Sequence, residues 1–118
     1  MERLLELAKS LGEGLGRTDE YQALKRAIEA VNGDRELAEL RTELERLEAE
    51  ITQALRAQQE PAEETRKAYE DAVSRLQASP VYQRLVAAQA NFDKILQKVN
   101  QTIEQGIQDG AESRIILP

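Results

Sequence analysis

The chain has 118 residues, enough for one domain. Its formal charge is −6 and it has no Lys/Arg cluster, and this charge pattern argues against a nucleic-acid-binding domain. It contains no cysteine and no histidine, which excludes disulfides, thiolate chemistry and histidine-based catalysis or metal ligation. One Phe, three Tyr, no Trp and 32% charged residues are typical of long helices and coiled coils. No window approaches about 18 apolar residues and the start lacks a signal-peptide pattern, so we expect a cytoplasmic protein without membrane insertion.

The first two predicted helices are short. Residues 1–13 form an amphipathic helix whose apolar side consists of Leu4, Leu7, Ala8 and Leu11. Glycines at positions 12, 14 and 16 predict the end of this helix, because glycine loses more backbone freedom on folding than any other residue. The next helix starts after Thr18, a good N-cap, and closes at Asn32-Gly33, a typical helix stop.

Residues 35–59 carry the clearest coiled-coil pattern. Their inner positions alternate in steps of three and four, namely Leu37, Leu40, Leu44, Leu47, Ile51, Ala54 and Gln58. The outer face is acidic, which is typical of a solvated face, and a specific basic partner is the alternative. Pro61 predicts a break, and a fourth helix follows over residues 61–77 with the small Ala68 and Ala72 on one side.

The longest predicted helix runs from Ser79, its N-cap, to Gln108. At about 100° per residue, one face carries Val81, Leu85, Ala88, Phe92, Ile95, Leu96, Val99, Ile103 and Ile107. That face is broader than contact with one helix requires, so we expect more than one neighbour. The opposite face is rich in amides, including Asn100 and Gln101, and is either a solvated face or a surface for a partner.

These elements predict an all-α fold of five helices, arranged as an elongated antiparallel bundle made mainly from the third, fourth and fifth helices. Residues 1–110 form a single all-helical domain, and residues 111–118 form an apolar tail that either docks on another chain or is disordered. The residues expected in the core or in an oligomer interface are Leu44, Leu47, Ile51, Leu85, Phe92, Ile95, Val99 and Ile103. The apolar stripes exceed what the short helices can cover, so we expect at least a dimer.

No motif indicates an enzyme, a metal or a cofactor. The glycines at 12, 14 and 16 do not follow a strand and lack the Gly-Lys-Ser/Thr ending of a phosphate-binding loop. Glu39 and Glu43 share a helical face and could hold Mg²⁺ or Ca²⁺ with a second carboxylate pair, but helices rich in Glu produce such pairs by chance. We therefore expect no catalytic residue, no metal site and no cofactor.

Two segments carry a family resemblance. Leu15-Gly16-Arg17-Thr18-Asp19-Glu20-Tyr21 and Val31-Asn32-Gly33-Asp34 resemble the N-terminal pattern of the YlbF/YmcA/YheA family of small bacterial helical proteins, closest to its YheA branch. The resemblance implies a cytoplasmic, non-enzymatic protein that self-associates. Some relatives act in a complex that adjusts a membrane-anchored ribonuclease in mRNA processing, and so affect competence and biofilm development. Their iron–sulfur clusters are held by cysteines, which this chain lacks.

The sequence therefore predicts a regulatory or adaptor protein that binds itself and other cytoplasmic proteins. A structural coiled-coil homo-oligomer or small chaperone is one alternative, and an RNA-binding accessory factor is another. The candidate partner-binding residues are Asn100 and Gln101 on the amide-rich face, and Ile115, Ile116 and Leu117 in the tail.

Overall fold

The chain is built from helices throughout the part that the structure describes. The computed structural model describes the backbone of residues 1–116 and the side chains of residues 1–113. Its five helices are α1 (Glu2–Gly16), α2 (Asp19–Asn32), α3 (Arg35–Arg56), α4 (Glu63–Ala78) and α5 (Pro80–Ile116). The described backbone contains no strand, and the predicted all-α fold of five helices is confirmed.

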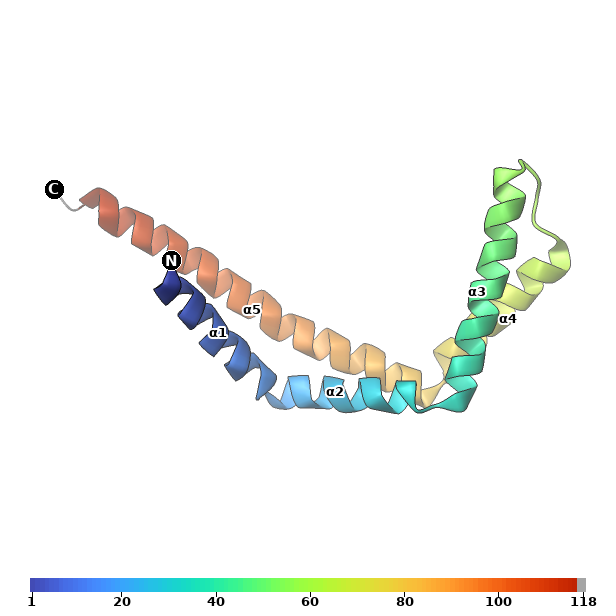
Figure 1. Cartoon of the computed structure of the whole chain (residues 1–118), viewed down its shortest axis with the longest axis horizontal. Helices are drawn as coiled ribbons and strands as arrows, with labels where there is room; N and C mark the ends of the chain where they lie inside the picture. The colour runs from blue at the N-terminus through green and yellow to red at the C-terminus, as the bar shows by residue number, and fades with distance from the viewer. Residues whose placement is uncertain (117–118) are drawn as a thin grey trace.

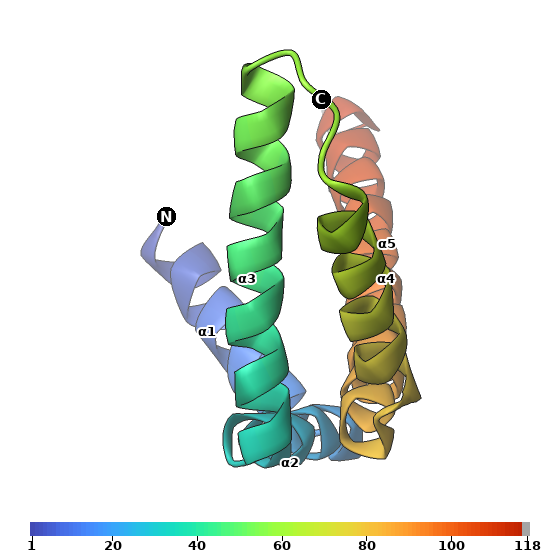
Figure 2. The ribbon, with the colours of Figure 1, turned by 90° about the vertical axis from the view of Figure 1, so that its right-hand side faces the viewer.

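The helices form two arms that meet at an elbow (Figure 1). The first arm consists of the long α5, with α2 packed along its N-terminal half and α1 farther out. The second arm is the antiparallel hairpin of α3 and α4, which lie side by side in Figure 2. The radius of gyration is 22.1 Å, whereas a compact domain of this length would have about 13.5 Å. The molecule is therefore elongated, as the composition indicated.

The partner of α5 differs from the prediction. We expected α5 to pack mainly with the third and fourth helices, but its main neighbour is α2. The reason lies in the two turns at the elbow, α2–α3 and α4–α5, which turn the hairpin away from α2 and α5. The chain therefore builds its elongated helical bundle from two helix pairs joined at the elbow.

Three short side chains cap the helices at these turns and at the junction of α1 with α2. Each accepts a hydrogen bond from the backbone N–H three residues later: Thr18 from Tyr21 at 3.1 Å, Asp34 from Leu37 at 2.9 Å and Ser79 from Tyr82 at 3.3 Å. Such a bond satisfies one of the N–H groups that a helix start leaves without a partner. The caps recognised in the sequence thus place the beginnings of α2, α3 and α5.

Four helix boundaries differ from the predicted ones by two residues or more. The first helix continues through Gly12 and Gly14 to Gly16, because its hydrogen bonding persists until Arg17, whose N–H bonds the carbonyl of Glu13 at 3.2 Å. Glycine costs about 1 kcal/mol relative to alanine inside a helix, which is a weak preference that the surrounding helix overrides.

The break near Pro61 is confirmed, although α3 already ends at Arg56 and α4 begins at Glu63. Gln58 has a φ of 58°, the left-handed conformation that ends many helices. The following N–H, of Gln59, bonds the carbonyl of Ala54 at 2.9 Å. This local hydrogen-bonding pattern ends α3 before the proline is reached.

The last helix passes the predicted end at Gln108 and continues through Gly110 to Ile116. Residues 111–116 are therefore helical and do not form an irregular tail. Leu117 and the side chains of Ile115 and Ile116 lie outside the described residues.

The buried residues form two small clusters, one in each arm. In the hairpin they are Leu37, Leu40, Leu47 and Ala72, with seven half-buried apolar residues around them. Between α2 and α5 they are Leu24, Ala27 and Ala88, with Leu85 and Phe92 packed against them. The ring of Phe92 meets that of Tyr21 edge-on, with centroids 5.2 Å apart. The alanines let the paired helices approach closely, which explains a core with so few aromatic residues.

Candidate interaction surfaces

The apolar side of α1 is largely uncovered in the described chain. This helix has no buried residue, and its main neighbour is α2, the next helix along. Leu4 and Leu5 are each 62% exposed, and Leu7 and Leu11 are 51% and 40% exposed. An isolated helix of about 12–15 residues is only marginally stable in water. A helix of 15 residues with four uncovered leucines therefore lacks the packing that stabilises most helices in proteins.

The distal half of α5 is uncovered in the same way. Every described residue from 100 to 113 is exposed, and Ile103 and Ile107 are 45% and 66% exposed. This stretch lies on the same arm as α1, away from the elbow (Figure 1). We call Leu4, Leu5, Leu7, Leu11, Ile103 and Ile107 together the distal apolar surface. Its residues come from both ends of the chain.

The residues predicted for the core or for an interface divide into three groups. Leu47 is 1% exposed and is fully buried in the hairpin. Six are half-buried, namely Leu44, Ile51, Leu85, Phe92, Ile95 and Val99. Ile103, which we expected at the buried centre of the last helix, is outside the core of the single chain because α2 does not reach that far along α5.

Of the predicted partner-binding residues, Asn100 and Gln101 lie on α5 where the helix becomes fully exposed. They therefore adjoin the distal apolar surface. The other three, Ile115, Ile116 and Leu117, have no described side chains.

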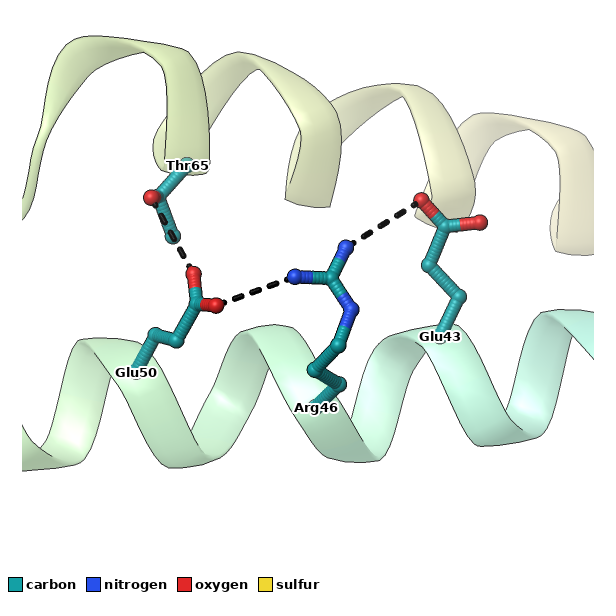
Figure 3. Close-up of polar contacts among 4 residues, drawn as sticks. All are labelled: Glu43, Arg46, Glu50 and Thr65. Carbon is teal, nitrogen blue, oxygen red and sulfur yellow. Dashed lines mark hydrogen bonds and ion pairs between the residues drawn. The ribbon is translucent and has the colours of Figure 1, made fainter.

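The acidic face of α3 carries a small polar network (Figure 3). Arg46 bonds Glu50 at 2.9 Å and lies 3.9 Å from Glu43, and Glu50 also accepts a hydrogen bond from the Thr65 hydroxyl at 3.3 Å. The last bond links α3 to α4 across the hairpin. All these groups are substantially exposed, so each pair contributes about 0–1 kcal/mol.

Glu39 and Glu43, the pair considered for a cation in the sequence, both lie on α3. Within residues 1–116, no group of three or more acidic side chains is placed to hold a metal ion. Nor is any helix of that part both long and apolar enough to cross a membrane.

A groove at the elbow was not foreseen from the sequence. It has a volume of about 260 Å³ and is lined by residues from α2, α3, α4 and α5. We call it the elbow groove. Its apolar lining residues are Val31, Leu37, Leu44, Leu76, Tyr82 and Leu85, and its charged ones are Arg41, Glu45 and Glu48. No sequence pattern could indicate it, because the four helices meet only in the folded chain.

The sequence is similar to a known family of proteins over most of its length. The family model described as "Control of competence regulator ComK, YlbF/YmcA" matches residues 4–108. A UPF0342 protein of Lactobacillus acidophilus is 28% identical over 109 residues, which cover 92% of this chain and 94% of the relative. A UPF0342 protein of Limosilactobacillus reuteri is 26% identical over 106 residues, covering 90% and 86% of the two chains. Because the family model spans all but the two ends of the chain, this protein belongs to the YlbF/YmcA family.

Proposed function

We propose that this protein is a non-enzymatic regulatory adaptor that self-associates through the distal apolar surface and acts by binding other proteins. The observation that carries the proposal is the set of six large aliphatic side chains left uncovered on one arm. The family description, control of a competence regulator, supports a regulatory role. Scattered exposed apolar residues are normal on proteins, whereas the four leucines of α1 lie together on one short helix, as expected of an interaction site.

The energetics allow a dimer only where nearly all of this surface is buried. Full burial of a Leu or Ile side chain contributes about 1.5–3 kcal/mol, and these six are already partly covered, so each would contribute roughly 1 kcal/mol on association. Two copies would together contribute about 12 kcal/mol, which is of the same order as the roughly 4–15 kcal/mol cost of association. Self-association at this surface therefore requires that most of the surface be covered.

The charges beside the surface limit how a second copy can be oriented. On α1 they are Glu2, Arg3, Glu6, Lys9 and Glu13, and on distal α5 they are Lys94, Lys98, Glu104, Asp109 and Glu112. Both signs alternate on α1, whereas on α5 the two lysines precede the three acidic residues. Two copies avoid an extended region of like charge when the acidic end of α5 faces Arg3 and Lys9 of α1 in the other copy.

Light scattering of the full chain tests the dimer. At micromolar concentration we expect a mass of at least twice the 13.3 kDa of one chain. Leu7→Glu should shift the protein towards the monomer, because it introduces a charge into the interface. Leu55→Glu is the matched control, since Leu55 is 62% exposed but lies at the end of α3, outside the distal surface. A wild-type protein that scatters as a clean monomer would contradict the proposal.

The C-terminal end of α5 is the second part of the proposed interface. Deletion of residues 111–118 should weaken self-association or capture of a partner protein and lower the helical circular-dichroism signal only slightly. Asn100→Lys and Gln101→Glu test the adjoining amide-rich face in the same assays. If the shortened chain keeps both its oligomeric state and its partners, this end makes no contribution to the interface.

A client-binding chaperone is the second candidate function, because the same uncovered leucines would suit unfolded chains. Affinity capture from the native cell extract separates the two. A few defined proteins support the adaptor, whereas a broad range of unfolded clients supports the chaperone. An RNA gel shift at several salt concentrations tests the accessory-factor alternative, since binding through phosphates weakens as salt rises.

A further inference from the structure

The elbow groove has apolar walls that come from both arms. Leu37 is buried, and the remaining apolar lining residues are half-buried and accessible from the groove. Val31 belongs to the end of α2, Leu76 to α4, and Tyr82 and Leu85 to the first turns of α5. Because the walls belong to four different helices, the groove exists only while the elbow keeps its angle.

Charged residues of α3 form one rim of the groove. Arg41, Glu45 and Glu48 are exposed, and none of the three has an ion-pair partner within 4 Å among the described side chains. Glu45 and Glu48 also line an adjoining hollow farther along α3, together with Thr52 and Arg56. The two carboxylates thus face open solvent beside an apolar depression, on a chain of net charge −6.

The volume of the groove suits individual side chains of a partner protein. Sites for small molecules usually have about 300–1,000 Å³, and this groove has about 260 Å³. A groove of this size can receive large apolar side chains as anchors. Amphipathic helices bind other proteins by inserting such anchors, spaced three or four residues apart, into an apolar groove.

We propose that the elbow groove binds an amphipathic helix of a partner protein whose apolar anchors are flanked by Lys or Arg. The anchors occupy the apolar walls, and the basic residues face Glu45 and Glu48. This inference rests on the proposed function, since it gives the chemistry of a partner for the adaptor. A second copy of this chain is the poorer occupant, because it carries the same charge of −6 and its exposed helix α1 has three Glu against one Arg and one Lys.

A synthetic peptide tests the chemistry of the occupant. The probe is a fluorescently labelled helical peptide of Leu and Lys with Leu at positions three and four residues apart, and the control peptide has Glu in place of every Lys. Fluorescence anisotropy with the full chain at low ionic strength should show that the Lys peptide binds at least about tenfold more tightly than the Glu peptide. Equal binding of the two peptides, or no binding of the Lys peptide, would overturn the proposal.

Charge reversal locates the binding site. The double variant Glu45→Lys/Glu48→Lys should weaken binding of the Lys peptide about tenfold, because two attractive contacts become repulsive. The matched control is Glu64→Lys/Glu70→Lys on the exposed side of α4, which changes the net charge by the same amount. All four residues are exposed, so both variants should fold. Equal losses in the two variants would show that the peptide responds only to net charge, and would overturn the assignment to the groove.

Because the chain contains no cysteine, a single introduced cysteine can carry a dye that detects binding in the groove. An environment-sensitive dye attached to Arg41→Cys should shift its emission when the Lys peptide binds, and the same dye on Ser74→Cys, on the exposed side of α4, should not. A shift that follows protein concentration without peptide would identify a second copy as the occupant and refute the proposal. If the protein dimerises but ignores the peptide, this inference fails while the proposed self-association stands.

Discussion

The hairpin of α3 and α4 should depend strongly on Leu47. This side chain is 1% exposed, the most deeply buried large residue of the described chain, and it packs in one cluster with Leu37, Leu40 and Ala72. Leu47→Ala removes three carbon groups from this cluster, which costs about 2.4 kcal/mol at roughly 0.8 kcal/mol per group. The cavity left behind adds to that cost, although two helices can partly close it. We expect a loss of about 3 kcal/mol of stability.

That loss is large enough to measure by thermal unfolding. At roughly 2.1 cal/mol/K per residue, a chain of 118 residues unfolds with an entropy of about 250 cal/mol/K. A destabilisation of about 3 kcal/mol should therefore lower the Tm by about 12 °C. The matched control is Leu55→Ala, which makes the same change on the same helix at a side chain that is 62% exposed. The control should change the stability by no more than about 0.5 kcal/mol.

Circular dichroism at 222 nm, a wavelength that reports helix content, would follow the unfolding of both variants. Protein concentration must be equal in all samples, because self-association makes the Tm depend on concentration. Urea unfolding of the same samples gives the stability difference at one temperature and checks that the slope is unchanged. If Leu47→Ala and Leu55→Ala lose the same small amount of stability, α3 and α4 are not packed through this residue.

The remaining predictions concern the first arm and the caps. Phe92→Ala should lower the free energy of unfolding by up to about 3 kcal/mol in a urea titration. This is the low end for a Phe truncation, because the ring is half-buried. Gln97→Ala, at an exposed position, should leave the free energy of unfolding unchanged. Gly12→Ala and Gly14→Ala should each stabilise α1 by about 0.5–1 kcal/mol, seen as increased helicity, since an added Cβ meets nothing within 4 Å. Asp34→Ala should cost about 1 kcal/mol in thermal unfolding through loss of the α3 cap, and an unchanged Tm would refute that role.

Most of the local structure could be predicted from the sequence because its signals are local. A cap such as Thr18 or Asp34 acts on a backbone N–H three residues away, so its effect can be anticipated without the fold. The spacing of Leu37, Leu40 and Leu47 indicated one buried face of α3, and all three are buried. Helix ends were less predictable, because the ends of α1 and α5 depend on weak glycine preferences that neighbouring helical residues override.

Only the tertiary structure decided which helices meet. An apolar stripe shows that a helix face avoids water, but it does not name the helix that covers it. The pairing of α5 with α2 follows from the turns at the elbow, and Ile103 is exposed because α2 does not reach that far along α5. No stretch of sequence encodes either arrangement by itself. The elbow groove has the same origin, since Val31 and Tyr82 are far apart in the chain and line one depression only after folding. Helix formation depends on neighbours in the sequence, whereas surfaces for partners depend on contacts between distant segments.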